Sequence, residues 1–170
     1  MSESGISSVF VAGAGLMGSG IAQTAAQSGL AVLLYDAMEG AAASAIAQIG
    51  ARLERAEQSG RMAAGAAAAA REHLHGVEGP EAAANSQMVI EAISEKLETK
   101  LAFWSALDEI CPESVLFASN TSSIPITRLA ATTGRPAQFI GMHFYSPVPV
   151  MELVELVRGC SPPTPPTPPW

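Results

Sequence analysis

A glycine-rich loop, GAGLMG at residues 13–18, has the residue types and spacing that could bind a nucleotide. Gly13 allows a tight turn, Gly15 has no Cβ to keep the backbone away from a pyrophosphate, and Gly18 lets a following helix pack close to the preceding strand. Free amides at the start of that helix, together with the helix dipole, favour an anion. The loop therefore predicts a pyrophosphate site, to which we also assign Leu16 and Met17.

An acidic residue follows at the place where a carboxylate could select the cofactor. Asp36 lies 21 residues after Gly15, at the end of the next predicted strand, and a carboxylate there accepts hydrogen bonds from the ribose hydroxyls. It would repel a 2′-phosphate, and Ala37 and Met38 provide no arginine to attract one. The sequence therefore favours NAD over NADP. The alternative is a glycine turn in an α/β protein that binds no nucleotide.

Four motifs in order carry a resemblance to one enzyme family. They are GAGLMGSGIA at 13–22, EAISEKLETK at 91–100, SNTSS at 119–123 and HFYSPVPVMELVE at 143–155. From about Val9 to Gly159 the chain resembles the NAD-binding domain of the L-3-hydroxyacyl-CoA dehydrogenases, including the bacterial 3-hydroxybutyryl-CoA dehydrogenases. The resemblance implies an acyl-CoA substrate and NAD-dependent oxidation of L-3-hydroxyacyl-CoA to 3-oxoacyl-CoA.

The same resemblance implies three catalytic residues. His143 matches the family's catalytic histidine, and imidazole suits removal of a hydroxyl proton because it titrates near neutral pH. Glu155 matches its carboxylate partner, which would hold the imidazole tautomer and stabilise the imidazolium. Ser122 matches a serine that hydrogen-bonds the reacting oxygen near the nicotinamide. The structural alternatives are a satisfied histidine at a strand end, a solvated strand glutamate and a serine that caps a helix.

Three further residues match positions near the cofactor. Glu95 and Lys100 match residues that line the NAD site, although Lys100 could equally be a solvated charge on a helix. Ser146 stands where many members have asparagine beside the nicotinamide, and a serine can also hydrogen-bond there. The CoA contacts have no clear match, because the 38–80 region contains no lysine; Arg52, Arg55 or Arg61 remain as candidates for the phosphates.

The elements that must position these residues alternate between strands and helices. Apolar runs predict strands over 9–12, 31–35, 88–93, 115–119, 139–144 and 153–157. Helical spacing predicts helices over 16–28, 38–59, 97–111 and about 125–131. This order predicts an α/β fold with a Rossmann-type doubly wound, mostly parallel sheet. Right-handed crossovers then bring the glycine loop, Asp36, Glu95, the Ser122 loop and His143 to one edge. His73 and His75 match no motif, and we expect them at the surface.

Composition excludes several classes of protein. The 170-residue chain has a net charge of −7 and no basic stripe, so it is not expected to bind nucleic acid. No apolar run is long enough to span a membrane, and the N-terminus is unlike a signal peptide, so we expect a cytoplasmic protein. Cys111 and Cys160 make neither zinc spacing nor a disulfide framework, and no metal site is predicted. Cys111 is expected to be a small buried apolar side chain.

The end of the sequence departs from the family. Members continue into a helical C-terminal domain that dimerises and closes the substrate cleft, whereas this chain runs from Gly159 into SPPTPPTPPW. We therefore expect residues 1–160 to be the NAD-binding domain, residues 161–170 to be a disordered proline-rich tail, and the helical domain to be absent. The expected chain is a truncated monomer that turns over slowly alone. Alternatives are a non-catalytic NAD-binding module and a related hydroxyacid dehydrogenase.

Overall fold

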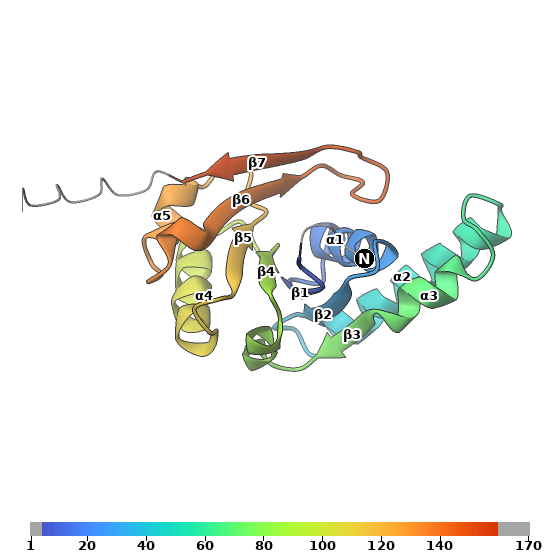
Figure 1. Ribbon diagram of the computed structural model, residues 1–170, viewed down its shortest axis with the longest axis horizontal. Helices are drawn as coiled ribbons and strands as arrows, with labels where there is room; N and C mark the ends of the chain where they lie inside the picture. Colours follow the sequence, from blue (N-terminus) through green and yellow to red (C-terminus); the bar gives the residue numbers. More distant parts are fainter. Residues whose placement is uncertain (1–4, 160–170) are drawn as a thin grey trace, which may run out of the picture.

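The computed structural model describes residues 5–159, which form a seven-stranded sheet with helices on both faces (Figure 1). The strand order is β3-β2-β1-β4-β5-β6-β7, and all neighbours are parallel except β6 and β7, which are antiparallel. This arrangement confirms the doubly wound, mostly parallel sheet. The strands are β1 (Ser8–Ala12), β2 (Ala31–Tyr35), β3 (Leu74–Val77), β4 (Met88–Glu91), β5 (Leu116–Ser119), β6 (Phe139–Phe144) and β7 (Val154–Arg158).

Helices cover both faces of the sheet, and successive residues of a strand point into the two buried clusters in turn. Val9 and Val11 of β1 belong to one buried cluster, whereas Phe10 and Ala12 belong to another. The first cluster lies against α1 (Leu16–Gln27), α2 (Ala41–Gln58) and α3 (Ala66–Glu72). The second lies against α4 (Leu97–Ile110), α5 (Ile126–Ala130) and the short 3₁₀ helix η1 (Pro80–Asn85); a second 3₁₀ turn, η2 (Pro136–Gln138), precedes β6.

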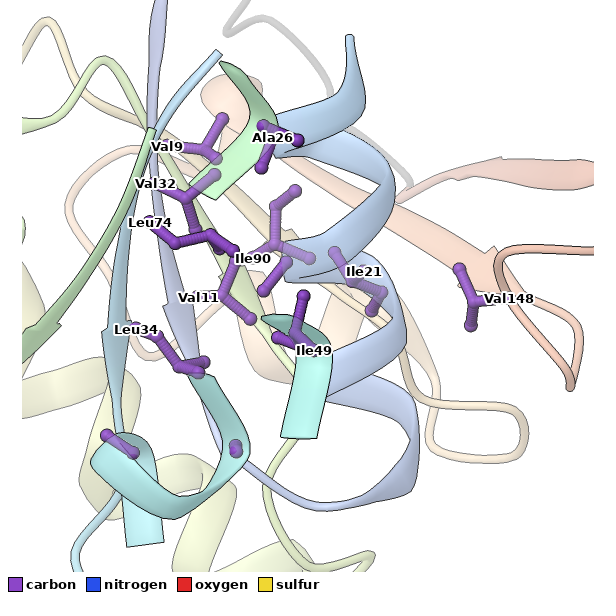
Figure 2. Close-up of a cluster of buried hydrophobic side chains, with 14 of the residues drawn as sticks. Val9, Val11, Ile21, Ala26, Val32, Leu34, Ile49, Leu74, Ile90 and Val148 are labelled. Carbon is purple, nitrogen blue, oxygen red and sulfur yellow. The ribbon is translucent and has the colours of Figure 1, made fainter. Parts of the chain in front are cut away.

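The first cluster also fixes the loop between β6 and β7. Its aliphatic side chains gather between the sheet and the helices, with Val148 on the far side of α1 from Val11 (Figure 2). Val148 is 5% exposed and packs where α1 has a glycine: a Cβ added to Gly20 would lie 2.8 Å from the Val148 Cβ. The loop that follows His143 is therefore packed against the helix that follows the glycine loop.

The direction of winding reverses between β1 and β4, which are neighbours in the sheet. The helix after β1 covers one face and the helix after β4 covers the other, so their loops diverge at the carboxyl edge. Ligands of open α/β sheets bind in the crevice formed at such a switch point. The fold thus places residues 13–18 and 92–96 on either side of one crevice.

One strand was missed by the sequence analysis. We predicted no strand between 35 and 88, but Leu74–Val77 forms β3 at the edge of the sheet, paired with β2. Only Leu74 of its four residues is buried, and Gly76 and His75 are exposed, so the sequence LHGV has no apolar run to detect. The predicted tail over 161–170 and Cys160 lie outside the described residues.

Candidate functional site

The glycine loop turns directly from β1 into α1. The Gly13 amide donates to the Tyr35 carbonyl (2.8 Å), and Gly13 has φ +99°, a conformation that favours glycine. A Cβ on Gly18 would lie 1.7 Å from the Gly13 carbonyl oxygen, whereas a Cβ on Gly15 would meet open space. Gly13 and Gly18 are therefore required by the fold itself. Gly15 is not, and its bare backbone faces a region that a ligand could fill.

The first turn of α1 presents free backbone donors. Gly15 is its N-cap without a side-chain hydrogen bond, and no acidic residue lies in the first turn. Such an end carries unsatisfied N–H groups and a partial positive charge. The turn can accept a pyrophosphate, and the adjoining Gly15 offers the space for it.

Asp36 lies beside this loop at the end of β2. Its Oδ2 accepts a hydrogen bond from the Ala14 amide (2.7 Å), and its Oδ1 accepts one from the Met38 amide (2.9 Å). The carboxylate is thus held in a fixed orientation next to the glycine loop. Each carboxylate oxygen can accept more than one hydrogen bond, so capacity for ribose hydroxyls remains.

A cavity of about 390 Å³ brings together most of the other predicted site residues. Met17 comes from the glycine loop, Glu95 and Lys100 from the segment after β4, and Ser122 from the segment after β5. His143 and Ser146 come from the end of β6 and the loop after it. The remaining lining residues are Ala92, Ile93, Asn120, Phe144 and Tyr145.

His143 and Glu155 form a cross-strand pair in the β6–β7 hairpin. They are directly opposite in the register, and His143 Nδ1 lies 3.2 Å from Glu155 Oε2. The imidazole side chain is 22% exposed and the glutamate side chain is 55% exposed. With Nδ1 engaged by the carboxylate, Nε2 is the ring nitrogen left to exchange a proton with a ligand in the cavity.

The burial of Lys100 excludes one of the two interpretations of this residue, a solvated charge on a helix. Its side chain is 1% exposed and pairs with Glu91 and, at 3.1 Å, with Glu95, so a solvated helix charge is wrong. Glu95 also accepts hydrogen bonds from Thr121 Oγ1 and Ser123 Oγ. Burial would raise the pKa of Glu95, but those hydroxyls and the Lys100 ammonium together lower it below its usual value. Glu95 is therefore a carboxylate at neutral pH.

The loop after β5 contains residues that the sequence analysis did not single out. The Asn120 side chain accepts a hydrogen bond from the Phe144 amide (2.8 Å) and so ties this loop to the strand that carries His143. Ser122 is exposed and does not cap α5, whose N-cap is Pro125, so the capping interpretation is wrong. Glu91 was also missed; the signal was a charged residue inside an apolar strand.

A second cavity, of about 610 Å³, includes the four residues that follow Ser146 in the chain, Pro147–Val150. Arg52, Arg55 and Arg61 also line it. Burial, and then the neighbouring Arg55, lower the pKa of Arg52. Within residues 5–159 no carboxylate pairs with these three guanidinium groups within 4 Å. The cavity therefore combines an apolar wall with positive charge that an anionic ligand could neutralise.

The described residues offer neither a membrane-spanning helix nor a cluster of metal ligands. None of the helices in the described part of the chain is both long and apolar enough to cross a bilayer. Over the same residues, no group of three or more His, Cys, Asp or Glu side chains is arranged to hold a metal ion. Cys111 is buried, as expected, and burial raises the pKa of its thiol.

Comparison with known proteins agrees with the fold and the motifs. Residues 8–164 match the family described as "3-hydroxyacyl-CoA dehydrogenase, NAD binding domain". The chain is 44% identical over 156 residues to a probable 3-hydroxybutyryl-CoA dehydrogenase of Bacillus subtilis, covering 92% of this chain and 54% of that protein. It is also 44% identical to the 3-hydroxyadipyl-CoA dehydrogenase of Escherichia coli, covering 92% of this chain and 33% of that one.

Solved structures give the same result. The (S)-3-hydroxybutyryl-CoA dehydrogenase of Ralstonia eutropha superposes with a TM-score of 0.87 at 42% identity, over 91% of this chain and 54% of that one. The Escherichia coli 3-hydroxybutyryl-CoA dehydrogenase superposes with a TM-score of 0.86 at 43% identity, over 89% and 32% respectively. The chain thus spans about half the length of the Bacillus and Ralstonia proteins, and about a third of the Escherichia coli ones.

Proposed function

Because the chain belongs to the 3-hydroxyacyl-CoA dehydrogenase family and carries its NAD-binding domain, we propose a role in oxidising L-3-hydroxyacyl-CoA to 3-oxoacyl-CoA. The chain supplies the cofactor site and the acid–base pair for this reaction. The residues that line one cavity give this proposal its strongest support. His143, paired with Glu155, and Ser122 line the same cavity as Met17 of the cofactor loop. A base, a hydroxyl donor and the end of the pyrophosphate loop therefore meet around one space.

NAD fits the residues that would hold it. The free amides at the start of α1 and the open backbone at Gly15 would bind the pyrophosphate, and Asp36 would accept hydrogen bonds from the ribose. Glu95, Lys100 and Ser146 lie around the cavity that we assign to the nicotinamide. When bound, NAD would supply the nicotinamide ring that accepts a hydride from the substrate carbon that carries the hydroxyl.

His143 would act as the general base. Its Nε2 would take the proton of the 3-hydroxyl while the Nδ1–H donates to Glu155. The Glu155 carboxylate fixes this tautomer and stabilises the imidazolium that results. Ser122 would donate a hydrogen bond to the same substrate oxygen and so orient it toward Nε2.

The arginine-lined cavity is our candidate for the CoA portion of the substrate. Its Pro147–Val150 wall adjoins Ser146, so it lies next to the proposed reaction site along the chain. Guanidinium groups are suited to phosphates, and the apolar wall is suited to the pantetheine chain.

We expect the Arg55→Met/Arg61→Met variant to bind CoA about tenfold more weakly by calorimetry, because two phosphate contacts are lost. NADH affinity should not change, and neither affinity should change in Arg128→Met, which alters an exposed arginine of α5. Equal CoA affinity in the double variant would contradict the assignment.

The function itself is tested by titrating the chain with NADH, with and without acetoacetyl-CoA, and following nicotinamide fluorescence. Binding of NADH that is altered by acetoacetyl-CoA supports a dehydrogenase site with both ligands. Binding without any acyl-CoA effect would instead support a module that holds only the cofactor. No binding of NADH would contradict the proposal.

Asp36 provides a separate test of cofactor selection. We expect Asp36→Ala to weaken NAD binding about tenfold, because hydrogen bonds to a charged acceptor are lost, and to reduce the preference for NAD over NADP. Affinities for both cofactors would be measured by calorimetry on the same preparation. Glu39→Gln, which removes an equal charge from an exposed side chain nearby, should leave the preference intact. An unchanged preference in Asp36→Ala would refute the ribose contact.

A further inference from the structure

A buried lysine lies behind the proposed nicotinamide cavity. The Lys100 side chain comes from α4 and is 1% exposed, although the residue borders the cavity. Its Nζ pairs with Glu91, which is fully buried, and lies 3.1 Å from Glu95 Oε2. Because the ammonium is already engaged by two carboxylates and shielded from solvent, it is poorly placed to contact a cofactor directly.

The Glu91 end of this cluster is anchored in the sheet. Its Oε2 accepts a hydrogen bond from Ser119 Oγ (2.7 Å), and its Oε1 accepts one from the Ile93 amide (2.9 Å). The carboxylate thus links the ends of β4 and β5, and both of its oxygens accept hydrogen bonds. Removing one member of a buried charged pair leaves the other uncompensated, so Glu91 and Lys100 hold each other in place.

The Glu95 end reaches the loop that carries Ser122. While Oε2 faces Lys100, Oε1 accepts hydrogen bonds from Thr121 Oγ1, from Ser123 Oγ (3.2 Å) and from the Ser122 amide (3.3 Å). The Glu95 side chain is 42% exposed, so packing restrains it less than it restrains Glu91 or Lys100. Without the ammonium, two carboxylates would lie close together and repel each other.

We propose that Lys100 is a positioning residue, which fixes Glu95 against Glu91 and thereby holds the 121–123 loop in the orientation that Ser122 needs. This inference deepens the proposed function and rests on it for the role of Ser122. It replaces a direct contact between Lys100 and NAD with an indirect one. Glu91, which begins the EAISEKLETK motif but was given no role from the sequence, becomes the fixed point of the arrangement.

The first readout requires no cofactor. Amide hydrogen exchange, followed by NMR, should be faster at Ser122 in both Lys100→Met and Glu95→Gln, and about equally fast in the two. Exchange in the first turn of α1 should remain as in the parent chain. Lys96→Met, which alters the exposed lysine just before α4, is the matched control and should change neither region. Unchanged exchange at Ser122 in Lys100→Met would overturn the proposal.

The second readout is a double-mutant cycle on NADH affinity. We expect about tenfold weaker binding in Lys100→Met, in Glu95→Gln and in the double variant, because all three lose the same orientation. Binding of ADP-ribose, which lacks the nicotinamide, should not change. If the double variant instead bound NADH about a hundredfold more weakly, the product of the two single effects, Lys100 would act independently of Glu95 and the proposal would be overturned. An equal loss of ADP-ribose affinity would also overturn it.

A third variant covers the case in which Lys100→Met does not fold. Glu91→Gln/Lys100→Met removes both buried charges and should restore folding, yet Ser122 exchange should stay fast because Glu95 has lost its partner. Exchange restored to the parent rate in this folded variant would contradict the proposal. If the parent chain binds no NADH at all, the proposed function fails, while the exchange experiment still decides the role of Lys100.

Discussion

Replacing His143 by glutamine should reduce turnover by about 10² to 10⁴, the usual contribution of a positioned general base, while leaving NADH affinity unchanged. Glutamine keeps a polar side chain of similar length on β6 but cannot take up the substrate proton. Turnover would be measured as reduction of acetoacetyl-CoA by NADH. Because the chain spans about half of the Bacillus protein, the assay uses residues 1–159 joined to the remainder of that relative.

Glu155→Gln is the matched variant for this prediction. It removes the charge opposite His143 but retains an acceptor for the Nδ1–H, so its loss of turnover should be smaller than that of His143→Gln. The proposed role of His143 would be refuted by full turnover in His143→Gln. A large loss of NADH affinity would also count against it, since that would place the imidazole in cofactor binding instead of proton transfer.

Two glycines of the 13–18 loop should respond to the same substitution in opposite ways. Gly15→Ala should fold normally, because its Cβ meets open space, yet bind NADH about ten- to a hundredfold more weakly, because that space is where the pyrophosphate would lie. Gly18→Ala places a Cβ 1.7 Å from the Gly13 carbonyl oxygen. It should lower the free energy of unfolding by about 3 kcal/mol.

Thermal unfolding and NADH titration on both variants separate the two effects. Gly18→Ala should unfold about 10 °C lower than the parent chain, while Gly15→Ala should unfold at the parent temperature. Gly134→Ala is a useful reference, since it adds the same methyl group outside the loop at an exposed glycine without positive φ, where the nearest atom is 3.4 Å away. Parent-like NADH affinity in Gly15→Ala would show that no ligand approaches the backbone at that point.

The first βαβ unit was predictable because each of its signals is local. The apolar run at 9–12 and the glycines after it specify a buried strand, a turn and a helix, and the structure has β1 and α1 at those places. The resemblance also implied that Glu155 is the partner of His143, and the hairpin places the two side chains directly opposite each other. The catalytic roles of these residues, which rest on the resemblance, remain predictions.

Long-range partners were not predictable in the same way. Glu91 pairs with a lysine nine positions later and with Ser119. A charge inside the apolar strand β4 was the signal, but it does not identify either partner. Asn120 accepts its hydrogen bond from the amide of Phe144, 24 residues away on β6. That β6 lies beside β5, which ends just before Asn120, is known only from the sheet order. The β3 strand has too few apolar residues to signal itself and forms because β2 offers a free edge.

The position of Glu155 on the last strand has a consequence for how the molecule opens. β7 is the terminal strand of the sheet, pairs only with β6, and all five of its residues are exposed. Elements with few buried contacts unfold locally at the lowest free energy, long before the global transition. Opening of β7 would separate Glu155 from His143 while β1, β4 and the glycine loop stay folded. The proposed proton-transfer pair can therefore be lost from a molecule that still binds its dinucleotide, so the rate of hydrogen exchange in β7 sets an upper limit on how long the pair persists.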